Sequence, residues 1–260
     1  MKPIALVDLD DTLFQTRRKI VGIADADLVI ASHATNGSHS YMTPVQAAMA
    51  EWLVASTEAI PVTARGSEAL SRVTIPFNSY AIVANGAVIL GRDGKADAEW
   101  NEKISSALGE HRAYFEELLA AGNKRATEMN VSIRSWAVME GDMATYVVFK
   151  ENDGDGSRLH EIIPVVEQEG WVRHRNGNNL ALIPPVISKR LASEFLLQRL
   201  LAETPSRPVL GFGDSVSDMS YLSLCDWWGA PGKSQLTDLV VEAAASHGEQ
   251  QTIAPPFERS

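Results

Sequence analysis

The sequence predicts an α/β protein with a doubly wound parallel-sheet core and an inserted α+β domain. Near both ends of the chain, short apolar runs alternate with helical patterns, which is typical of a parallel sheet covered by helices. The middle of the chain instead follows the order helix-strand-strand twice, with hairpin turns that indicate an antiparallel sheet. We therefore expect the core at residues 1–88 and 185–260 and the inserted domain at residues 89–184.

Each element of the core has a local signal. Residues 3–7 are a short apolar run that ends in acids, as expected for a strand buried on both faces. A helix over residues 44–58 begins after the N-cap Thr43, with Pro44 at its first position. Its expected buried stripe consists of Val45, Ala48, Met49, Trp52 and Leu53. The other core elements are strands at 59–62, 80–84 and 209–212 and a short helix at 66–72.

The inserted domain has equally local signals. A helix over residues 98–122 is expected to end at Gly122-Asn123, and a second helix over 157–169 ends at Gly170. The pair Asn176-Gly177 joins two of its strands, and Asn-Gly is the strongest short-range hairpin signal. The expected strands of this domain are 130–139, 143–150, 171–175 and 178–183.

Composition excludes several classes of protein. The chain has 260 residues and a net charge of −10, which opposes nucleic-acid binding because that binding depends on Lys and Arg at phosphates. The single cysteine, Cys225, excludes an intrachain disulfide and a multi-cysteine zinc site, and the six histidines have no metal-ligand spacing. The N-terminal apolar run is too short for a signal peptide, and no window approaches 18 apolar residues. We expect a soluble cytoplasmic protein without a membrane or nucleic-acid partner.

Two pairs of acids follow predicted strands of the core. Asp8 and Asp10 follow the first strand, and their spacing of two points both side chains to the same side of an extended backbone. Asp214 and Asp218 follow the strand at 209–212. Either pair alone is compatible with a solvated turn or an N-cap. Two pairs at carboxyl ends of strands, where open α/β sheets bind ligands, favour a site for a divalent cation such as Mg²⁺.

The order of these motifs resembles a known superfamily. Asp8-x-Asp10-x-Thr12, Thr63, Lys189 and Gly213-Asp214-x-x-x-Asp218 are similar, in that order, to the four motifs of the haloacid dehalogenase-like (HAD) superfamily, which is mostly phosphatases. The resemblance implies a Rossmann-like core. The insertion between the second and third motifs resembles the cap of the Cof-like and sucrose-phosphatase-like branch, and residues 84–87 (Ala-Asn-Gly-Ala) are also similar to that branch.

The chain departs from this branch at two places. Ser217 stands where Cof-like members usually carry Asn, and Ser215 is closer to the sucrose-phosphatase side. The segment at 17–43 is longer than expected. It contains two apolar stretches, at 27–31 and 41–42, around Asn36-Gly37, and we interpret it as a β-flap.

The resemblance implies a magnesium-dependent phosphatase that hydrolyses a small phosphate monoester, such as a sugar phosphate, through an aspartyl-phosphate. Asp8 would be the nucleophile and Asp10 the general acid and base; Thr63 and Lys189 would bind the phosphoryl group. The implied magnesium ligands are Asp8, the backbone carbonyl of Asp10, Asp214 and, directly or through water, Asp218. The residues expected to bind the substrate are Thr63, Arg65, Asn85, His174, Asn179 and Lys189.

The last hairpin predicts which face of the cap meets the substrate. With Asn176-Gly177 as the turn, Arg175 pairs with Asn178 and His174 with Asn179. One face, which we expect to cover the cap helices, then carries Trp171, Arg173, Arg175, Asn178, Leu180 and Leu182. The face expected to look toward the core carries Val172, His174, Asn179, Ala181 and Ile183. In the alternative, the arginines point to the site.

Two other functions stay open. A phosphotransferase or phosphomutase of the same superfamily would pass the phosphoryl group to a second hydroxyl. A phospho-regulated binding module would be non-enzymatic, since response-regulator receivers also combine acids, Thr and Lys on an α/β sheet; the length, the insertion and the second acidic pair argue against it. The presence of Asp10 disfavours a dehalogenase, because a halide leaving group needs no general acid.

Overall fold

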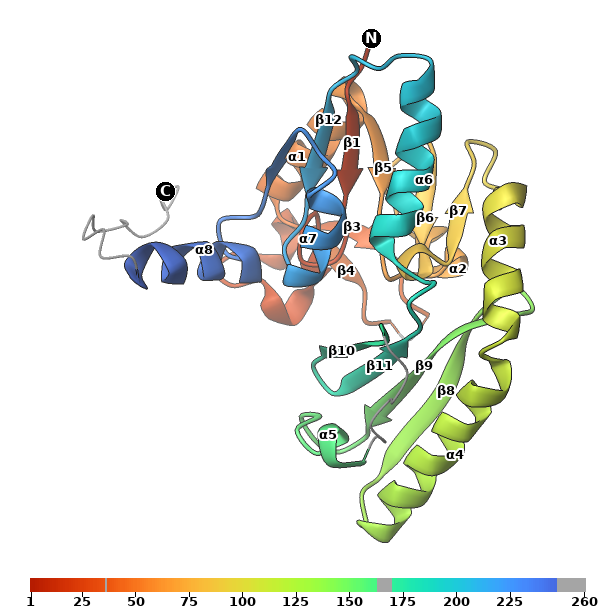
Figure 1. Ribbon diagram of the computed structural model, residues 1–260. Helices are drawn as coiled ribbons and strands as arrows, with labels where there is room; N and C mark the ends of the chain where they lie inside the picture. The colour runs from red at the N-terminus through yellow and green to blue at the C-terminus, as the bar shows by residue number, and fades with distance from the viewer. Residues whose placement is uncertain (36, 163–169, 247–260) are drawn as a thin grey trace.

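The computed structural model describes residues 1–35, 37–162 and 170–246, and it shows a core domain above a cap domain (Figure 1). The core sheet has the strand order β13 (Trp227–Gly229), β12 (Val209–Phe212), β1 (Ile4–Val7) and β5 (Glu58–Pro61), all parallel. β6 (Ala81–Val83) follows β5 through a parallel bridge and pairs with β7 (Val88–Leu90) in an antiparallel hairpin. The predicted parallel core is confirmed.

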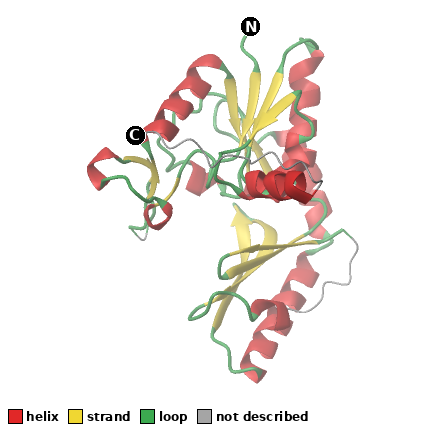
Figure 2. Ribbon diagram, turned by 90° about the vertical axis from the view of Figure 1, so that its left-hand side faces the viewer, coloured by secondary structure: helices red, strands yellow, loops and turns green. Residues whose placement is uncertain are grey.

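The central strand β1 is buried on both faces because helices cover both sides of the sheet (Figure 2). Ile4 and Leu6 share a cluster with α6 (Lys189–Ala202). Ala5 and Val7 point to the opposite side and share a cluster with α1 (Pro44–Ser56). The alternation of side chains along a strand therefore explains why four successive apolar residues are all needed here.

The helix α1 begins as predicted but buries a different face. Thr43 and Gln46 form a capping box, and Pro44 is the first helical residue. Of the predicted stripe only Leu53 is buried; Val45 and Trp52 are 56% and 47% exposed. The prediction was wrong because α1 packs on the sheet mainly through Ala50 and Leu53, with Ala47, Met49 and Val54 at the edge of the contact, and this face is rotated away from Val45 and Trp52.

The segment between the first acids and α1 is a small antiparallel sheet, as the β-flap interpretation required. Its strands lie in the order β2 (Gln15–Thr16), β4 (Ser40–Met42), β3 (Val29–Ser32). Two 3-10 turns, η1 (Arg17–Lys19) and η2 (Asp25–Asp27), connect β2 to β3. Asn36 of the predicted turn lies outside the described residues.

The predicted helix over 98–122 is two helices, α3 (Ala98–Gly109) and α4 (Arg112–Glu128). Gly122 does not end the second helix, so this prediction was wrong. A Cβ atom on Gly122 would lie 2.3 Å from Cε1 of Phe149, and the glycine therefore allows α4 to approach the sheet closely. The other helix, α3, packs against β7 of the core, and its Trp100 Nε1 donates a hydrogen bond to the Gly86 carbonyl at 3.0 Å.

The cap sheet is antiparallel, with the order β10 (Val172–Asn176), β11 (Asn179–Ile183), β9 (Met143–Glu151), β8 (Ile133–Glu140). The helix α4 runs along its outer face (Figure 1). Only α5 (Leu159–Ile162) is described of the predicted helix at 157–169, and residues 163–169 lie outside the described part. The helix-strand-strand order is confirmed, while the boundary at 88/89 stays a prediction.

The β10–β11 hairpin has a different register from the predicted one. Asn176 pairs with Asn179, His174 with Ala181 and Arg175 with Leu180, so the turn residues are Gly177 and Asn178. The turn is displaced because Asn178 binds the end of β9. Its side-chain nitrogen donates to the Glu151 carbonyl at 2.7 Å, and its own carbonyl accepts from the Glu151 amide at 3.0 Å. Since each partner moves by two positions, the side chains keep their predicted faces.

The remaining elements surround the carboxyl edge of the core sheet. They are α2 (Ser67–Leu70), η3 (Ala84–Gly86), η4 (Val216–Asp218), α7 (Met219–Leu222) and α8 (Gln235–Ser246). Within the described ranges, the helices are all too short or too polar to cross a bilayer.

Candidate active site

The predicted nucleophile lies directly after β1, at the edge of the core sheet that faces the cap (Figure 1). The Asp8 amide donates to the Phe212 carbonyl of β12 at 2.9 Å, which continues the strand pairing by one residue. The Asp8 side chain is 8% exposed. The sheet therefore holds this carboxylate in a nearly buried position at the junction of the two domains.

Lys189 joins the first and the last motif. Its Nζ lies 2.7 Å from Asp8 Oδ1 and 2.7 Å from Asp218 Oδ1. The residue is the first of α6, whose N-cap Ser188 accepts a hydrogen bond from the Arg190 amide. The helix N-terminus therefore adds its partial positive charge beside the ammonium group.

The turn at residues 84–86 packs against the start of α6. A Cβ atom on Gly86 would lie 2.3 Å from the Ser188 carbonyl oxygen, so only glycine permits this close approach. Its φ of +99° is also in the region that favours glycine. The preceding Asn85 has a φ of 58° and donates its amide to the Thr63 carbonyl at 3.0 Å. This turn therefore links the second motif to the third.

Asp218 is fully buried and saturated with hydrogen bonds. Its Oδ1 accepts from Lys189, and its Oδ2 accepts from the Asp214 amide, the Ser215 amide and the Ser215 hydroxyl at 2.8–3.2 Å. Asp218 therefore orders the loop after β12 and neutralises Lys189. Ser215 is the residue that brings this motif closer to the sucrose-phosphatase side, and its hydroxyl takes part in this network.

The carboxylates of Asp8, Asp214 and Asp218 offer oxygens that all lie within 4.8 Å of one another. Burial raises the pKa of Asp8 to about 7, against the lowering effect of Lys189. Burial and the charge of Asp218 raise the pKa of Asp214 to about 6. Both shifts mean that burial and the neighbouring carboxylates disfavour the ionised forms of Asp8 and Asp214 when no further cation is bound. Because both oxygens of Asp218 already accept hydrogen bonds, Asp8 and Asp214 are the residues that fit a hard divalent ion.

Thr63 and Thr12 place hydroxyl groups at this edge. Thr63 is buried, and its Oγ1 accepts a hydrogen bond from the Arg65 amide at 3.1 Å, which leaves its proton to donate. The Thr12 hydroxyl lies 3.4 Å from an oxygen of Asp8 and 3.4 Å from one of Asp214. Both threonines therefore belong to the wall of the carboxylate site.

Asp10 is more exposed than Asp8 and is held by Arg65. The guanidinium of Arg65 binds both carboxylate oxygens of Asp10, at 2.7 and 2.8 Å, and also donates to the Ser32 hydroxyl of the flap at 2.8 Å. It lies 4.9 Å from the centre of the Phe14 ring. The predicted substrate-binding Arg65 is thus placed on the predicted general acid, with a fork geometry that orients the carboxylate.

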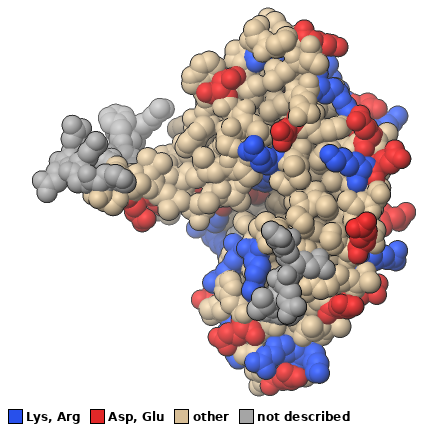
Figure 3. Space-filling view, in the orientation of Figure 1, with Lys and Arg blue, Asp and Glu red and all other residues tan. Residues whose placement is uncertain are grey.

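On the cap side, His174 and Asn179 both face the core, as predicted from the sheet faces. They line a cavity of about 690 Å³ between the domains, and His174 and Asn85 also line an adjoining cavity of about 380 Å³ that reaches Lys189. Burial, followed by the charge of Lys189, lowers the pKa of His174, which keeps its ring neutral near pH 7. Lys and Arg side chains lie beside this junction on one face of the molecule (Figure 3).

The other residues that line the larger cavity include Arg18, Trp136 and Tyr146, whose place there was missed in the sequence. Trp136 pairs with Val148 across β8 and β9, so the two-residue period of these strands would have placed it on the same face as His174. The Tyr146 hydroxyl hydrogen-bonds the Asn85 side chain of the core. Arg18 lies in the 3-10 turn η1 of the flap, where no sequence pattern marked it.

Several solved structures have a similar fold. A protein from Thermoplasma acidophilum aligns with a TM-score of 0.58 and 17% identity over 93% of this chain and 89% of its own. The sucrose-phosphatase from Synechocystis sp. PCC6803, solved with sucrose and phosphate, aligns with a TM-score of 0.55 and 17% identity over 95% and 99%. A haloacid dehalogenase-like hydrolase from Bacteroides thetaiotaomicron gives 0.51 and 12% over 95% and 100%.

These alignments cover core and cap together, so the chain has the fold of haloacid dehalogenase-like hydrolases with an inserted cap. The fold class expected from the ordered motifs is confirmed. No protein-family model matches the sequence, and no curated protein matches it either.

Proposed function

We propose that the protein is a magnesium-dependent phosphatase that hydrolyses a small phosphate monoester through an aspartyl-phosphate. The observation that carries this proposal is the position of Lys189, which bridges Asp8 and Asp218 beside Asp214 at the carboxyl edge of the core sheet. One buried cation among three carboxylates leaves a net negative site. Such a site suits a divalent cation, and a phosphate group can then be bound despite its own charge.

In the first step, an Asp8 carboxylate oxygen attacks phosphorus and the ester P–O bond breaks. The leaving oxygen takes a proton from Asp10, so that an alcohol departs and the phosphoryl group stays on Asp8. In the second step, Asp10 takes a proton from a water molecule, which attacks phosphorus. The bond to Asp8 breaks, inorganic phosphate is released and both carboxyl groups return to their initial states.

The other residues act by position and charge. Lys189 donates toward Asp8 and neutralises charge on the phosphoryl oxygens, and the Thr63 hydroxyl donates to one of those oxygens. Asp8, the Asp10 carbonyl and Asp214, with Asp218 nearby, would hold Mg²⁺, and the bound ion would neutralise charge on the phosphate. Arg65 keeps the Asp10 carboxylate in a defined orientation.

The cap cavity favours a sugar phosphate or a similar polyhydroxy metabolite. His174 and Asn179 offer hydrogen-bonding groups there, and Trp136 offers an exposed aromatic surface. Among proteins of this fold, one is a sucrose-phosphatase and another is described as related to trehalose-6-phosphate phosphatase, with 17% and 16% identity. Arg65 and Asn85 are part of the proposed substrate-facing wall through their contacts with Asp10 and Tyr146.

A panel of phosphorylated metabolites tests the proposal. The purified protein is incubated with each ester in Mg²⁺ and in excess chelator, and released phosphate is measured, with Asp8→Asn as the blank. We expect Mg²⁺-dependent release from at least one sugar phosphate in plain buffer. Consumption of an ester that requires an added acceptor alcohol, and that yields a new phosphate ester in place of inorganic phosphate, would instead identify a phosphotransferase. Absence of turnover on every ester, with phosphate-analogue binding retained, would favour the non-enzymatic binding module.

A further inference from the structure

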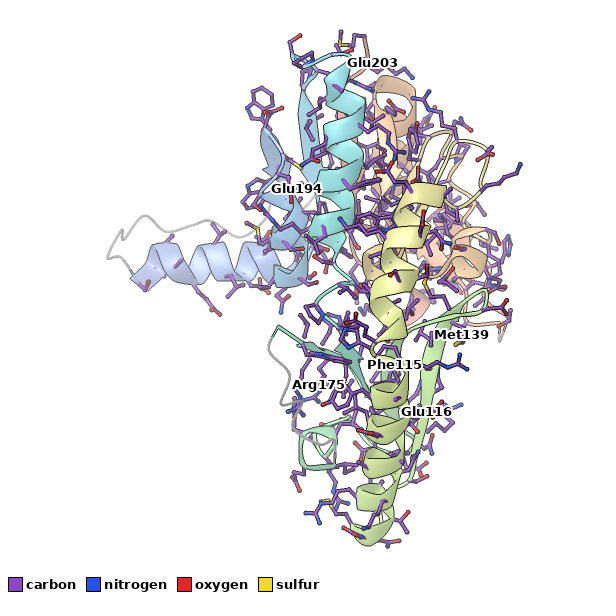
Figure 4. All side chains as sticks on the ribbon, turned by 45° about the vertical axis from the view of Figure 1, so that its right-hand side comes forward. Phe115, Glu116, Met139, Arg175, Glu194 and Glu203 are labelled. Atoms are coloured by element: carbon purple, nitrogen blue, oxygen red, sulfur yellow. The ribbon has the colours of Figure 1, made fainter. Side chains whose placement is uncertain are left out.

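The cap touches the core through a carboxylate that the proposed mechanism does not use. Glu140, the last residue of β8, accepts a hydrogen bond from the Ser67 amide at 3.0 Å and another from the Ser67 hydroxyl at 2.6 Å. Ser67 is the first residue of α2 in the core. Figure 4 shows Met139, the neighbour of Glu140, at the end of the cap sheet next to the core. The contact therefore crosses the junction between the domains.

The core partner of Glu140 belongs to the loop that carries the second motif. Gly66 has no room for a side chain, because a Cβ atom there would lie 2.2 Å from Glu140 Oε1. Arg65 precedes it and binds both oxygens of Asp10, and the Arg65 amide donates to Thr63 Oγ1. Five successive residues therefore connect the phosphoryl-binding hydroxyl, the holder of the general acid and the cap.

Two features make this contact sensitive to where the cap lies. The hydrogen bonds from Ser67 end on a half-buried carboxylate, so they are charge-assisted and short-ranged. Arg65 reaches Asp10 through a long side chain whose direction depends on the backbone of this loop. When Glu140 leaves Ser67, the loop loses the contact that fixes its far end.

We propose that Glu140 is a positioning residue that couples cap docking to the general acid. With Glu140 on Ser67, the loop holds Arg65 so that Asp10 points at the leaving oxygen. Without it, Asp10 samples other orientations, and both of its proton transfers are impaired, to the leaving oxygen and from the attacking water, while attack by Asp8 is not. The inference rests on the proposed phosphatase function and adds a residue of the cap to its acid step.

Leaving-group dependence separates this role from a general role in holding the cap. 4-Nitrophenyl and 4-methylphenyl phosphate have nearly the same size, but only the second has a leaving group that needs a proton. The quantity compared is kcat/KM, because it depends only on the steps up to departure of the alcohol and not on hydrolysis of the aspartyl-phosphate. If Glu140 acts through Asp10, Glu140→Ala lowers kcat/KM about tenfold or more for 4-methylphenyl phosphate and less than about twofold for 4-nitrophenyl phosphate. Glu140→Gln, which keeps one acceptor oxygen, has an intermediate effect. Glu117→Ala, on an exposed position of α4, is the matched control and changes neither rate.

Gly66→Ala is a second way to break the contact between Glu140 and Ser67. Its added methyl group displaces the Glu140 carboxylate while residue 140 remains a glutamate. We expect the same selective loss, and no additional loss when both changes are combined. Equal losses on the two esters, or no loss, would overturn the coupling of Glu140 to Asp10.

The variant Asp10→Asn is measured in parallel on the same two esters. If it shows no leaving-group selectivity, the acid role of Asp10 in the proposed function is wrong. If it does and Glu140→Ala does not, only the present inference fails.

Discussion

The core and the cap place their site residues by different physical means. In the core, Asp8 and Asp214 follow parallel strands, and Lys189 is the first residue of a helix that packs on that sheet. In the cap, His174 and Asn179 lie within strands, and they reach the cavity only because the sheet turns that face to the core. The carboxyl ends of parallel strands converge whatever their side chains are, whereas a sheet face depends on register and docking.

The two regions also differ in electrostatics. In the core site, Lys189 and Asp218 are nearly buried and are stabilised by their opposite charges and by hydrogen bonds, whereas Asp214 carries a charge that no described cation pairs with. The cap cavity is lined mainly by neutral groups, and burial keeps His174 neutral. We therefore expect changes in the core to abolish chemistry, and changes in the cap to alter which ester is chosen.

The largest expected effect is that of Asp8→Asn. The substitution keeps the shape but removes the attacking oxygen's charge, so turnover should fall by about four orders of magnitude or more. Lys189 keeps Asp218 as a partner, and the fold should persist with a similar melting temperature by circular dichroism. Near-normal turnover in this variant would contradict covalent catalysis and remove the contrast between core and cap.

The second effect concerns the cation and Asp214. Excess chelator should abolish turnover and Mg²⁺ should restore it. Because the pKa of Asp214 rises from 3.8 to about 6 on folding, the folded state favours the protonated form and loses stability as pH rises through 6. In chelator at pH 7, Asp214→Asn should therefore raise the free energy of unfolding by about 1 kcal/mol, allowing for partial exposure.

Thermal melts with and without Mg²⁺ check this second prediction. The wild type should gain stability with Mg²⁺, and Asp214→Asn should gain much less. A wild type that melts at the same temperature in Mg²⁺ and chelator, and turns over equally in both, would remove the cation from the site.

The third effect belongs to the cap. His174→Ala combined with Asn179→Ala should raise KM about tenfold for the best sugar phosphate and leave a generic aryl phosphate unchanged, because only the larger ester reaches these residues. Arg173→Ala, on the opposite face of β10, is the control. Equal kinetics of the double variant on both esters would show that this face does not select the substrate.

The smallest kinetic effect is expected for Gly122→Ala. The added methyl group meets the Phe149 ring, so the free energy of unfolding should fall by about 1–3 kcal/mol. Because α4 lies on the outer face of the cap sheet, kcat and KM should be unchanged at temperatures where the protein is folded. Urea unfolding and steady-state kinetics test both statements, and a change of specificity would show that strain in the cap reaches the site.

Sequence patterns were sufficient where a local rule has a single structural outcome. The apolar run at 3–7, the helix start marked by Thr43 and Pro44, and the strands of the cap all appeared where expected. They were insufficient where two outcomes have similar local signals. Val45 and Trp52 are apolar yet exposed, since α1 presents apolar residues on more than one side. Gly122 has the signature of a helix end, but it serves close packing.

The sequence by itself determined the class of fold and the membership of the core site, because strand ends and motif order are one-dimensional properties. Only the tertiary structure decided the partners across that site: Arg65 on Asp10, Tyr146 on Asn85 and Glu140 on Ser67. It also decided the β10–β11 turn, through bonds of Asn178 to a strand 27 residues earlier. These contacts join residues that are distant in the chain, and their geometry depends on how the cap docks, which no local pattern encodes.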